Sequence, residues 1–256
     1  LGKIRVGQTL GAWSSGNDAN TRRYNHAGAG IQTAAIIFGG TAGTSPPFNI
    51  EKGVASEIYD GTDWTTGPDI ASAKRLFAGC GTTTATLGAS GYPVPASGTD
   101  TEEFDGSSWT ETANLGTARY GAGVVGTQTA ALCITGDSYP GSETVNVEQY
   151  NGASWTEIAN VNTSRRTGFG VGTTTAALYA GGADDDLSPQ TTDVVESWNG
   201  SSWTEVADLN GIMSHLGGAG ISTAAIVWGG YAPGDPWSAT TESWDGSTWT
   251  EIADMS

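Results

Sequence analysis

Five near-copies of one sequence unit follow each other along this chain, and each ends in a strand, a tight turn and a tryptophan. The endings read EIYDGTDWT, EEFDGSSWT, EQYNGASWT, ESWNGSSWT and ESWDGSTWT, with the tryptophans at Trp64, Trp109, Trp155, Trp203 and Trp249. Successive tryptophans lie 45, 46, 48 and 46 residues apart, so one unit has been duplicated in tandem with small insertions. A repeat of this length built from short strands is typical of a β-propeller.

Each unit contains four segments with strand character. In the fourth unit these are TGFGVG, TTTAALYAGG, VVESWNG and SSWTEVA. Alternating apolar residues, enrichment in Thr, Val, Ile and Trp, and Asp-Gly or Asn-Gly turns predict hairpins, and no segment has an uninterrupted helical period with caps. The first strand is nearly all Gly and Ala, which suits a crowded ring around an axis. We therefore predict an all-β chain, a five-bladed β-propeller of four-stranded antiparallel blades.

The order of features in the unit resembles the kelch repeat. A polar loop ending in Arg leads to a glycine strand, a glycine pair closes the next strand, and Glu, an aromatic residue and a spaced Trp follow. The matching residues are Arg75, Arg119 and Arg166, then Gly39-Gly40, Gly181-Gly182 and Gly229-Gly230, then Glu57, Glu103, Glu148, Glu196 and Glu242. The resemblance covers roughly residues 13–254. It implies the fold alone, because kelch propellers include enzymes, adaptors and lectin-like proteins.

The N-terminus leaves the closure of the ring open. Ala12-Trp13-Ser14 followed by NDANTRR imitates WTEIANVNTSRR, which makes six candidate outer strands for five sets of the other three. Either this segment packs beside the C-terminal strand, or the chain contains part of a sixth blade. We expect five blades, because half a blade would leave unpaired edges. Residues 1–16 are then an N-terminal extension with a possible closing strand, and residues 17–256 a single propeller domain.

Composition excludes several partners and sites. The net charge is −17, from 27 acidic and 10 basic side chains, which argues against a nucleic-acid backbone as partner. No apolar run is long enough to span a bilayer, so we expect no membrane insertion. The chain begins with Leu, which suggests a processed product or a portion of a longer one. Cys80 and Cys133 fall in different blades, and we expect two free, buried thiols.

We predict no catalytic activity, no cofactor and no metal site. The two histidines, His26 and His215, have no third His or Cys cluster beside them that would hold zinc or copper. The acids and amides of the tight turns are expected to brace those turns; they are Asp60, Asp105, Asn151, Asn199 and Asp245. The triple acid at residues 184–186 could supply oxygen ligands to calcium, but a solvated loop is the expectation.

Arginines and loop aromatics are the candidate binding residues. In a propeller the loops that carry Arg23, Arg75, Arg119 and Arg166 meet near the axis, where the guanidinium groups either tie neighbouring blades together or receive an anionic sugar or carboxylate. The long irregular loops lie on the same face, and variable loops on a rigid scaffold are where binding is expected. Their aromatic side chains offer flat surfaces to a sugar ring; these are Phe48, Tyr92, Tyr139, Tyr231 and Trp237.

The expected function is recognition. The nearly verbatim repetition of TTTAAL and NGSSWTE resembles repeat proteins predicted in tailed phages of marine bacteria. This resemblance implies a structural or recognition module displayed on a virion, in a tail or capsid appendage, that binds a cell-surface glycan or another virion protein through the long loops. Such a module would be a possible oligomer within a larger assembly and would be located in the virion or outside the cell. The alternative is a free soluble carbohydrate-binding lectin.

Overall fold

The computed structural model describes residues 16–42, 53–93, 97–138, 141–185, 189–235 and 238–255, and this part of the chain is all β. Five four-stranded antiparallel sheets follow each other in the sequence, and we number them from the first to the fifth. No α-helix occurs in the described residues, and none of their segments forms a helix that could cross a membrane. The predicted four-stranded unit is therefore confirmed.

Each sheet is a simple meander, so its strands stand in space in their order along the chain. The inner strands are β2 (Ala27–Ile31), β7 (Ala78–Thr82), β12 (Gly123–Thr127), β18 (Phe169–Thr173) and β22 (Gly217–Ile221). The second strands are β3 (Ala34–Phe38), β8 (Ala85–Ala89), β13 (Ala130–Ile134), β19 (Ala176–Ala183) and β23 (Ala224–Trp228).

The third and fourth strands form the hairpin that ends every unit. The third strands are β5 (Ser56–Tyr59), β9 (Thr101–Phe104), β16 (Val147–Tyr150), β20 (Thr191–Trp198) and β24 (Thr241–Trp244). The outer strands are β6 (Trp64–Gly67), β10 (Trp109–Glu111), β17 (Trp155–Glu157), β21 (Trp203–Glu205) and β25 (Trp249–Glu251). The aromatic residue of the third strand pairs directly with the tryptophan of the outer strand, as Trp198 does with Trp203.

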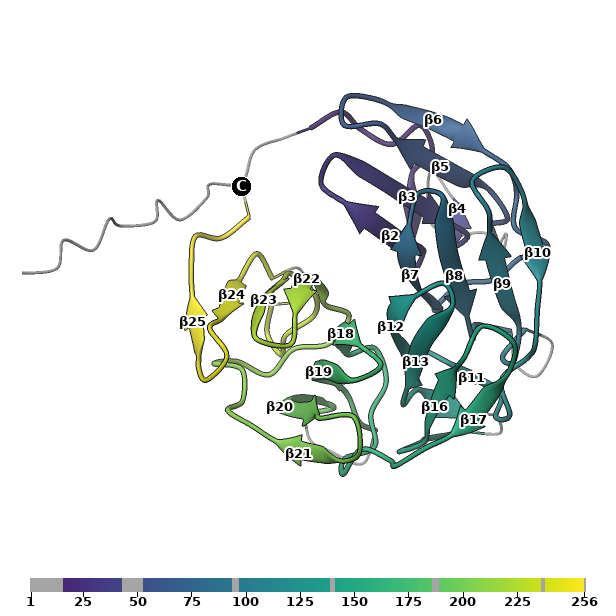
Figure 1. Ribbon diagram of the computed structural model, residues 1–256. Coiled ribbons are helices and arrows are strands. Elements are labelled where there is room, and N and C mark those ends of the chain that lie inside the picture. Colours follow the sequence, from purple (N-terminus) through teal and green to yellow (C-terminus); the bar gives the residue numbers. More distant parts are fainter. Residues whose placement is uncertain are drawn as a thin grey trace, which may run out of the picture.

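The sheets are arranged around a common axis in a propeller-like way. Figure 1 looks along this axis and shows the inner strands nearest the centre and the outer strands at the rim. Glycine allows this crowding: a Cβ added at Gly170 of β18 would lie 2.6 Å from a side-chain carbon of Val125 in the sheet before it. Bulkier inner strands would push neighbouring sheets apart.

Hydrophobic clusters between consecutive sheets hold the assembly together. In the described residues four such clusters occur, one at each junction from the first sheet to the fifth. Third-strand aromatic residues lie in these clusters, and Phe104, Tyr150 and Trp198 are at most 3% exposed. Neither a cluster nor a hydrogen bond joins the fifth sheet to the first in the described part of the chain, so Figure 1 shows an arc with one open side.

Candidate functional site

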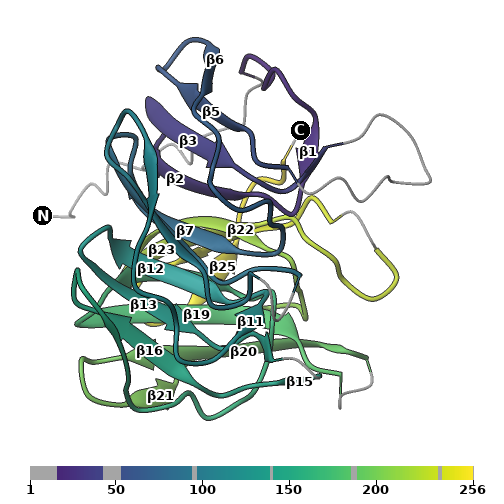
Figure 2. The same cartoon turned by 90° about the vertical axis from the view of Figure 1, so that its right-hand side faces the viewer.

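The order of strands sorts the connections onto two faces of the molecule. Connections within the two hairpins of a sheet lie on one face. The connection from second to third strand and the loop from the outer strand to the next sheet lie on the other, which we call the loop face. Small extra strands extend it: β1 (Arg23–Tyr24) pairs with β4 (Thr41–Ala42), and β14 (Asp137–Ser138) pairs with β11 (Arg119–Tyr120) and β15 (Ser142–Glu143). Figure 2 shows β1 and β15 toward its right-hand side.

The opposite face consists of uniform turns braced by their own side chains. Asp105 accepts hydrogen bonds from the amides of Ser107 and Ser108 at 2.8 Å, and Asn199 does the same for Ser201 and Ser202. The hydroxyl and amide donors, with the Ser107 hydroxyl first, lower the pKa of Asp105 to about 2. These bonds confirm that the turn residues shape the hairpins.

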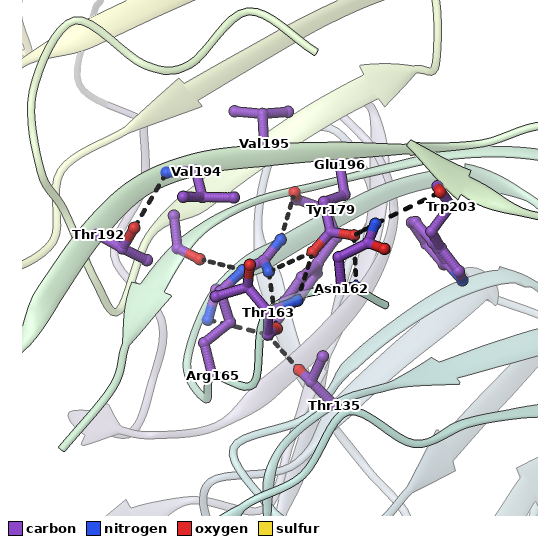
Figure 3. Close-up of polar contacts among 12 residues, drawn as sticks. Thr135, Asn162, Thr163, Arg165, Tyr179, Thr192, Val194, Val195, Glu196 and Trp203 are labelled. Carbon is purple, nitrogen blue, oxygen red and sulfur yellow. Dashed lines mark hydrogen bonds and ion pairs between the residues drawn. The ribbon is translucent and has the colours of Figure 1, made fainter. Parts of the chain in front are cut away.

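Below the loop face, every sheet holds a buried glutamate from its third strand. Figure 3 shows the fourth sheet, where Glu196 accepts hydrogen bonds from the amide and side chain of Asn162, both at 2.7 Å, and from Arg165 at 2.7 Å. The Arg165 guanidinium also donates to the carbonyl oxygens of Gly181 and Tyr179. Because both side chains are fully buried, this ion pair is part of the scaffold and is closed to solvent.

Four sheets contain this glutamate–cation pair, and its members correct the sequence assignment. The pairs are Arg23–Glu57, Lys74–Glu102, Arg119–Glu148 and Arg165–Glu196. The assignment of Glu103 was wrong by one residue, since Glu103 lies opposite Leu87 and accepts the Tyr150 hydroxyl instead. The assignments of Arg75 and Arg166 were likewise wrong by one residue, since the buried cations are the residues before them, Lys74 and Arg165. Counting seven residues back from the outer-strand tryptophan would have found Glu102, as it finds Glu57 and Glu196.

Two of the predicted binding arginines belong to these pairs. Arg119 is 0% exposed, and its guanidinium donates to Glu148 and to the carbonyl oxygen of Asn146. Arg23 donates to Glu57 and to the carbonyl oxygen of Ala55. The partners of each guanidinium lie in its own sheet, so these arginines fix the incoming loop to that sheet and do not tie neighbouring blades together as expected. The contacts leave neither group open to a ligand from solvent.

Arg75 begins a row of stacked groups on the loop face. It lies over the ring of Tyr92 at 4.7 Å from the ring centroid, and Tyr92 contacts Tyr120 edge to face at 5.8 Å. Arg75 and Tyr92 are also joined by backbone hydrogen bonds in both directions. The three side chains come from two consecutive sheets and are half-buried, so they form one continuous strip across the junction.

The strip continues into a charged cluster around Arg166. The Tyr120 hydroxyl donates to Asp137 at 2.5 Å, and burial together with this bond raises the pKa of Tyr120 to about 12. Arg166 donates to both carboxylate oxygens of Asp185 at 2.9 Å and contacts Glu143. The Asp185 carboxylate raises the pKa of Arg166, and Arg166 in turn lowers the pKa of Asp185. Arg166 is thus the predicted arginine with the most acidic surroundings.

The predicted loop aromatics differ in what the structure says of them. Tyr231 is 45% exposed and is joined to Ser214 by backbone hydrogen bonds in both directions. Tyr92 lies in the strip just described. Phe48, Tyr139 and Trp237 lie outside the described residues. Sequence reasoning missed Tyr120, which has no unusual sequence context and becomes part of the strip because β11 places it beside β14.

The remaining candidate groups are His26 and the two cysteines. His26 keeps an exposed edge, but desolvation of its ring, and then Arg23, lower its pKa to about 4. Cys80 and Cys133 are free and buried, as predicted, and burial raises the pKa of Cys80 to about 12 and of Cys133 to about 11. No group of three or more His, Cys, Asp or Glu side chains that could hold a metal ion occurs among the described residues.

Comparison with known proteins adds evidence on the fold. No family model matches the sequence, and no curated protein does. A solved structure described as "Structure of YjhT" has a TM-score of 0.70 to this chain at 14% sequence identity. The likeness covers 90% of this chain and 84% of that one. At this identity it supports the shared arrangement of sheets and carries nothing about activity.

Proposed function

We propose that this chain is a kelch-like propeller with five blades of its own and that it serves as a non-enzymatic recognition module. The module would be displayed on a phage virion, as part of a tail or capsid appendage, and would bind a surface glycan or a protein through the loop face. The five four-stranded sheets around one axis support the blade count. The display on a virion rests on the sequence resemblance to phage repeat proteins.

The choice of the loop face as the binding surface rests on one observation. Arg75, Tyr92 and Tyr120 form a stacked strip that leads into the charged cluster of Arg166 and Asp185. Aromatic surfaces beside carboxylate and guanidinium groups suit a sugar, because the rings contact its apolar face while the charged groups bond its hydroxyls. In the described residues the opposite face consists of short, uniform turns.

The ionisable groups of the strip and of the adjoining charged cluster favour binding over catalysis. Arg166 is neutralised by neighbouring carboxylates, and the raised pKa of Tyr120 keeps its hydroxyl protonated near neutral pH. A general acid or base works best with a pKa near the operating pH. These groups therefore suit hydrogen bonding to a neutral, polar ligand.

A glycan array probed with the isolated chain tests the proposal. Tyr92→Ala and Tyr231→Ala should each weaken binding at least about tenfold, since each removes an aromatic surface from the loop face. Thr204→Ala is the matched control, because Thr204 is exposed on β21 at the rim and should bind as the parent does. If both tyrosine variants bind normally and the rim variant does not, the binding surface is not the loop face.

Location separates the virion module from the free lectin. An antiserum against the chain should label purified particles if the chain is a virion part, and only the soluble fraction if it is a secreted lectin. Both the virion module and the free lectin would bind through the loop face, so the array result holds for either of them.

A further inference from the structure

The first and fifth sheets each have one face that no other described sheet covers. In the fifth sheet, Ile226 holds the position of Leu178 in the fourth, but it is only partly buried where Leu178 is 2% exposed. In the first sheet, Tyr59 holds the position of Trp198 and is likewise partly buried. These positions form the cores of the other junctions, so both uncovered faces have the composition of an interface.

The inner strands of the two end sheets also depart from the repeat in an apolar direction. The last residue of the inner strand is Thr in the three middle sheets, at Thr82, Thr127 and Thr173, and Ile in the two end sheets. Ile31 is 67% exposed and Ile221 57% exposed, although isoleucine is among the residue types most often fully buried. A hollow of about 500 Å³ also opens beside the first sheet, lined by Ala19, Arg22, His26, Ile37 and Trp64 among others.

Two series of backbone hydrogen bonds link consecutive sheets and stop at the open side. In the first series, one residue of each inter-sheet loop donates its amide to the carbonyl of the corresponding residue in the sheet before. The bonds are Leu76 to Asn25, Gly121 to Leu76, Thr167 to Gly121 and His215 to Thr167, at 3.0, 2.6, 2.7 and 2.8 Å. In the described residues, the Asn25 amide and the His215 carbonyl are left without partners of this kind.

The second series runs in the opposite direction. The glycine that follows the second strand, or its equivalent, donates its amide to a carbonyl in the next sheet. The bonds are Gly40 to Lys74, Gly91 to Arg119, Gly136 to Arg165 and Gly182 to Met213, at 2.9, 2.9, 3.1 and 2.8 Å. The Gly230 amide and the Arg23 carbonyl are the ends of this series among the described residues, and no bond between sheets reaches either of them there.

We infer that the open side is an interaction surface for one further repeat unit of the same sequence pattern. Such a unit would donate an amide to the His215 carbonyl and offer a carbonyl to the Gly230 amide. On its other side it would accept from Asn25 and donate to Arg23. Its alanine and aromatic positions would cover the partly buried faces, so one partner satisfies the polar ends and the apolar surfaces together.

The sequence before the first sheet supports this occupant. Trp13 stands seven residues before Asn20, as Trp155 stands seven before Asn162 and Trp203 seven before Asn210. Asn20 and Asn162 make the same bonds, each donating to the buried glutamate and to the carbonyl of the outer-strand tryptophan of its own sheet. Residues 12–20 therefore carry the pattern that follows from one unit into the next. The inference does not depend on the ligand proposed above.

An extended chain tests the inference. Residues 162–209, the fourth unit, are appended after Met255, which holds the place of Val161 in the pattern. In hydrogen exchange, the Gly230 and Asn25 amides should exchange at least about 100-fold more slowly than in the parent chain, because stable pairing limits exchange to opening events. The thermal midpoint should rise as well. A second extension with residues 116–161, the third unit, guards against a copy that fails to fold.

The matched control is Ile226→Lys, placed on the uncovered face of the fifth sheet. It should leave the parent nearly unchanged but remove the protection gained by either extension. Three results would overturn the inference. The two amides could be protected in a monomeric parent, so that the arc closes on itself. They could be protected only in a parent dimer, which would make a second copy the occupant. The third such result is that neither extension changes the exchange rates of these two amides.

Discussion

The fourth and fifth sheets place the same buried glutamate in the same way, but only the fourth supplies a cation for it. Asn162 bonds Glu196 through its amide and side chain, and Asn210 bonds Glu242 through the same groups at 2.9 and 2.7 Å. Three residues after each asparagine stands Arg165 in the fourth sheet and Met213 in the fifth. The asparagine contacts are therefore sufficient to hold the carboxylate in place.

The substitution changes the surroundings of the fifth carboxylate. Met213 is 2% exposed and belongs to the hydrophobic cluster between the two sheets, while Glu242 is 1% exposed and has no ion pair among the described residues. A hollow of about 280 Å³, lined by Glu242, Met213 and Ser238 among others, lies at this point. The comparison separates two roles that coincide in the other sheets: placing a carboxylate and neutralising it.

The largest effect is expected when the fourth sheet is made to resemble the fifth. Arg165→Met removes the guanidinium from a fully buried pair and leaves Glu196 without a counter-charge. Breaking a buried pair from one side typically costs about 3–5 kcal/mol of unfolding free energy. Denaturant unfolding measures this. A loss below about 1 kcal/mol would mean that Asn162 alone satisfies Glu196, and the two sheets would then be equivalent.

Removing the two carboxylates should have effects of opposite sign. Glu196→Gln leaves the buried Arg165 with a weaker partner and should destabilise by about 2–3 kcal/mol. Glu242→Gln removes a buried charge that has no cation and should stabilise by about 1 kcal/mol at pH 7. The pair of variants is compared by denaturant unfolding at one pH. Equal losses in both would contradict the difference between the sheets.

Restoring a cation to the fifth sheet should reverse the sign at Glu242. Met213→Arg replaces a core side chain by one end of an ion pair, so the single change should stay within about 1 kcal/mol of the parent. In that background Glu242→Gln should destabilise, although it stabilises the parent. A double-mutant cycle measures the coupling between the two positions. Additive effects would show that the introduced guanidinium does not reach the carboxylate.

The sequence was sufficient to predict the features that recur in every repeat unit at a fixed distance from its tryptophan. Their spacing fixed the four-stranded unit, and the Asp-Gly and Asn-Gly pairs fixed the turns, because both depend on local periodicity and turn chemistry. The choice between Arg165 and Arg166 could not be predicted in this way. Neighbouring residues of an extended loop point to opposite sides, and which side faces the core depends on how the loop meets the sheet.

Closure of the ring was beyond the sequence for a related reason. A repeat specifies how one unit packs on the next, but it does not state how many units complete a turn. The five copies predicted five sheets, and the open side between β22 and β2 became visible only in three dimensions. The Ile31 and Ile221 exceptions at a Thr position were the sequence signal that the end sheets differ.

The smallest expected effect is a pH dependence at His215 in the fifth sheet. His215 follows Met213 by two residues and has a positive φ of 58°, where the fourth sheet has Thr167 at 54° and the first has Asn25 at 54°. Desolvation of part of the ring, and then Arg166, lower the pKa of His215 below its usual 6.5, although the residue keeps an exposed edge. Between that lowered pKa and 6.5 the unfolded chain binds the proton more readily than the folded one. The contribution of neutral His215 to stability is therefore complete above pH 6.5 and declines as the pH falls.

His215→Asn should flatten this decline, because asparagine tolerates the left-handed backbone and does not titrate. The difference in unfolding free energy between parent and variant should be constant above about pH 7 and should shift in favour of the variant toward pH 5. His26→Asn is the comparison in the first sheet, where burial and Arg23 lower the pKa to about 4. Parallel curves for His215→Asn and the parent down to pH 5 would mean that folding does not lower the pKa of His215.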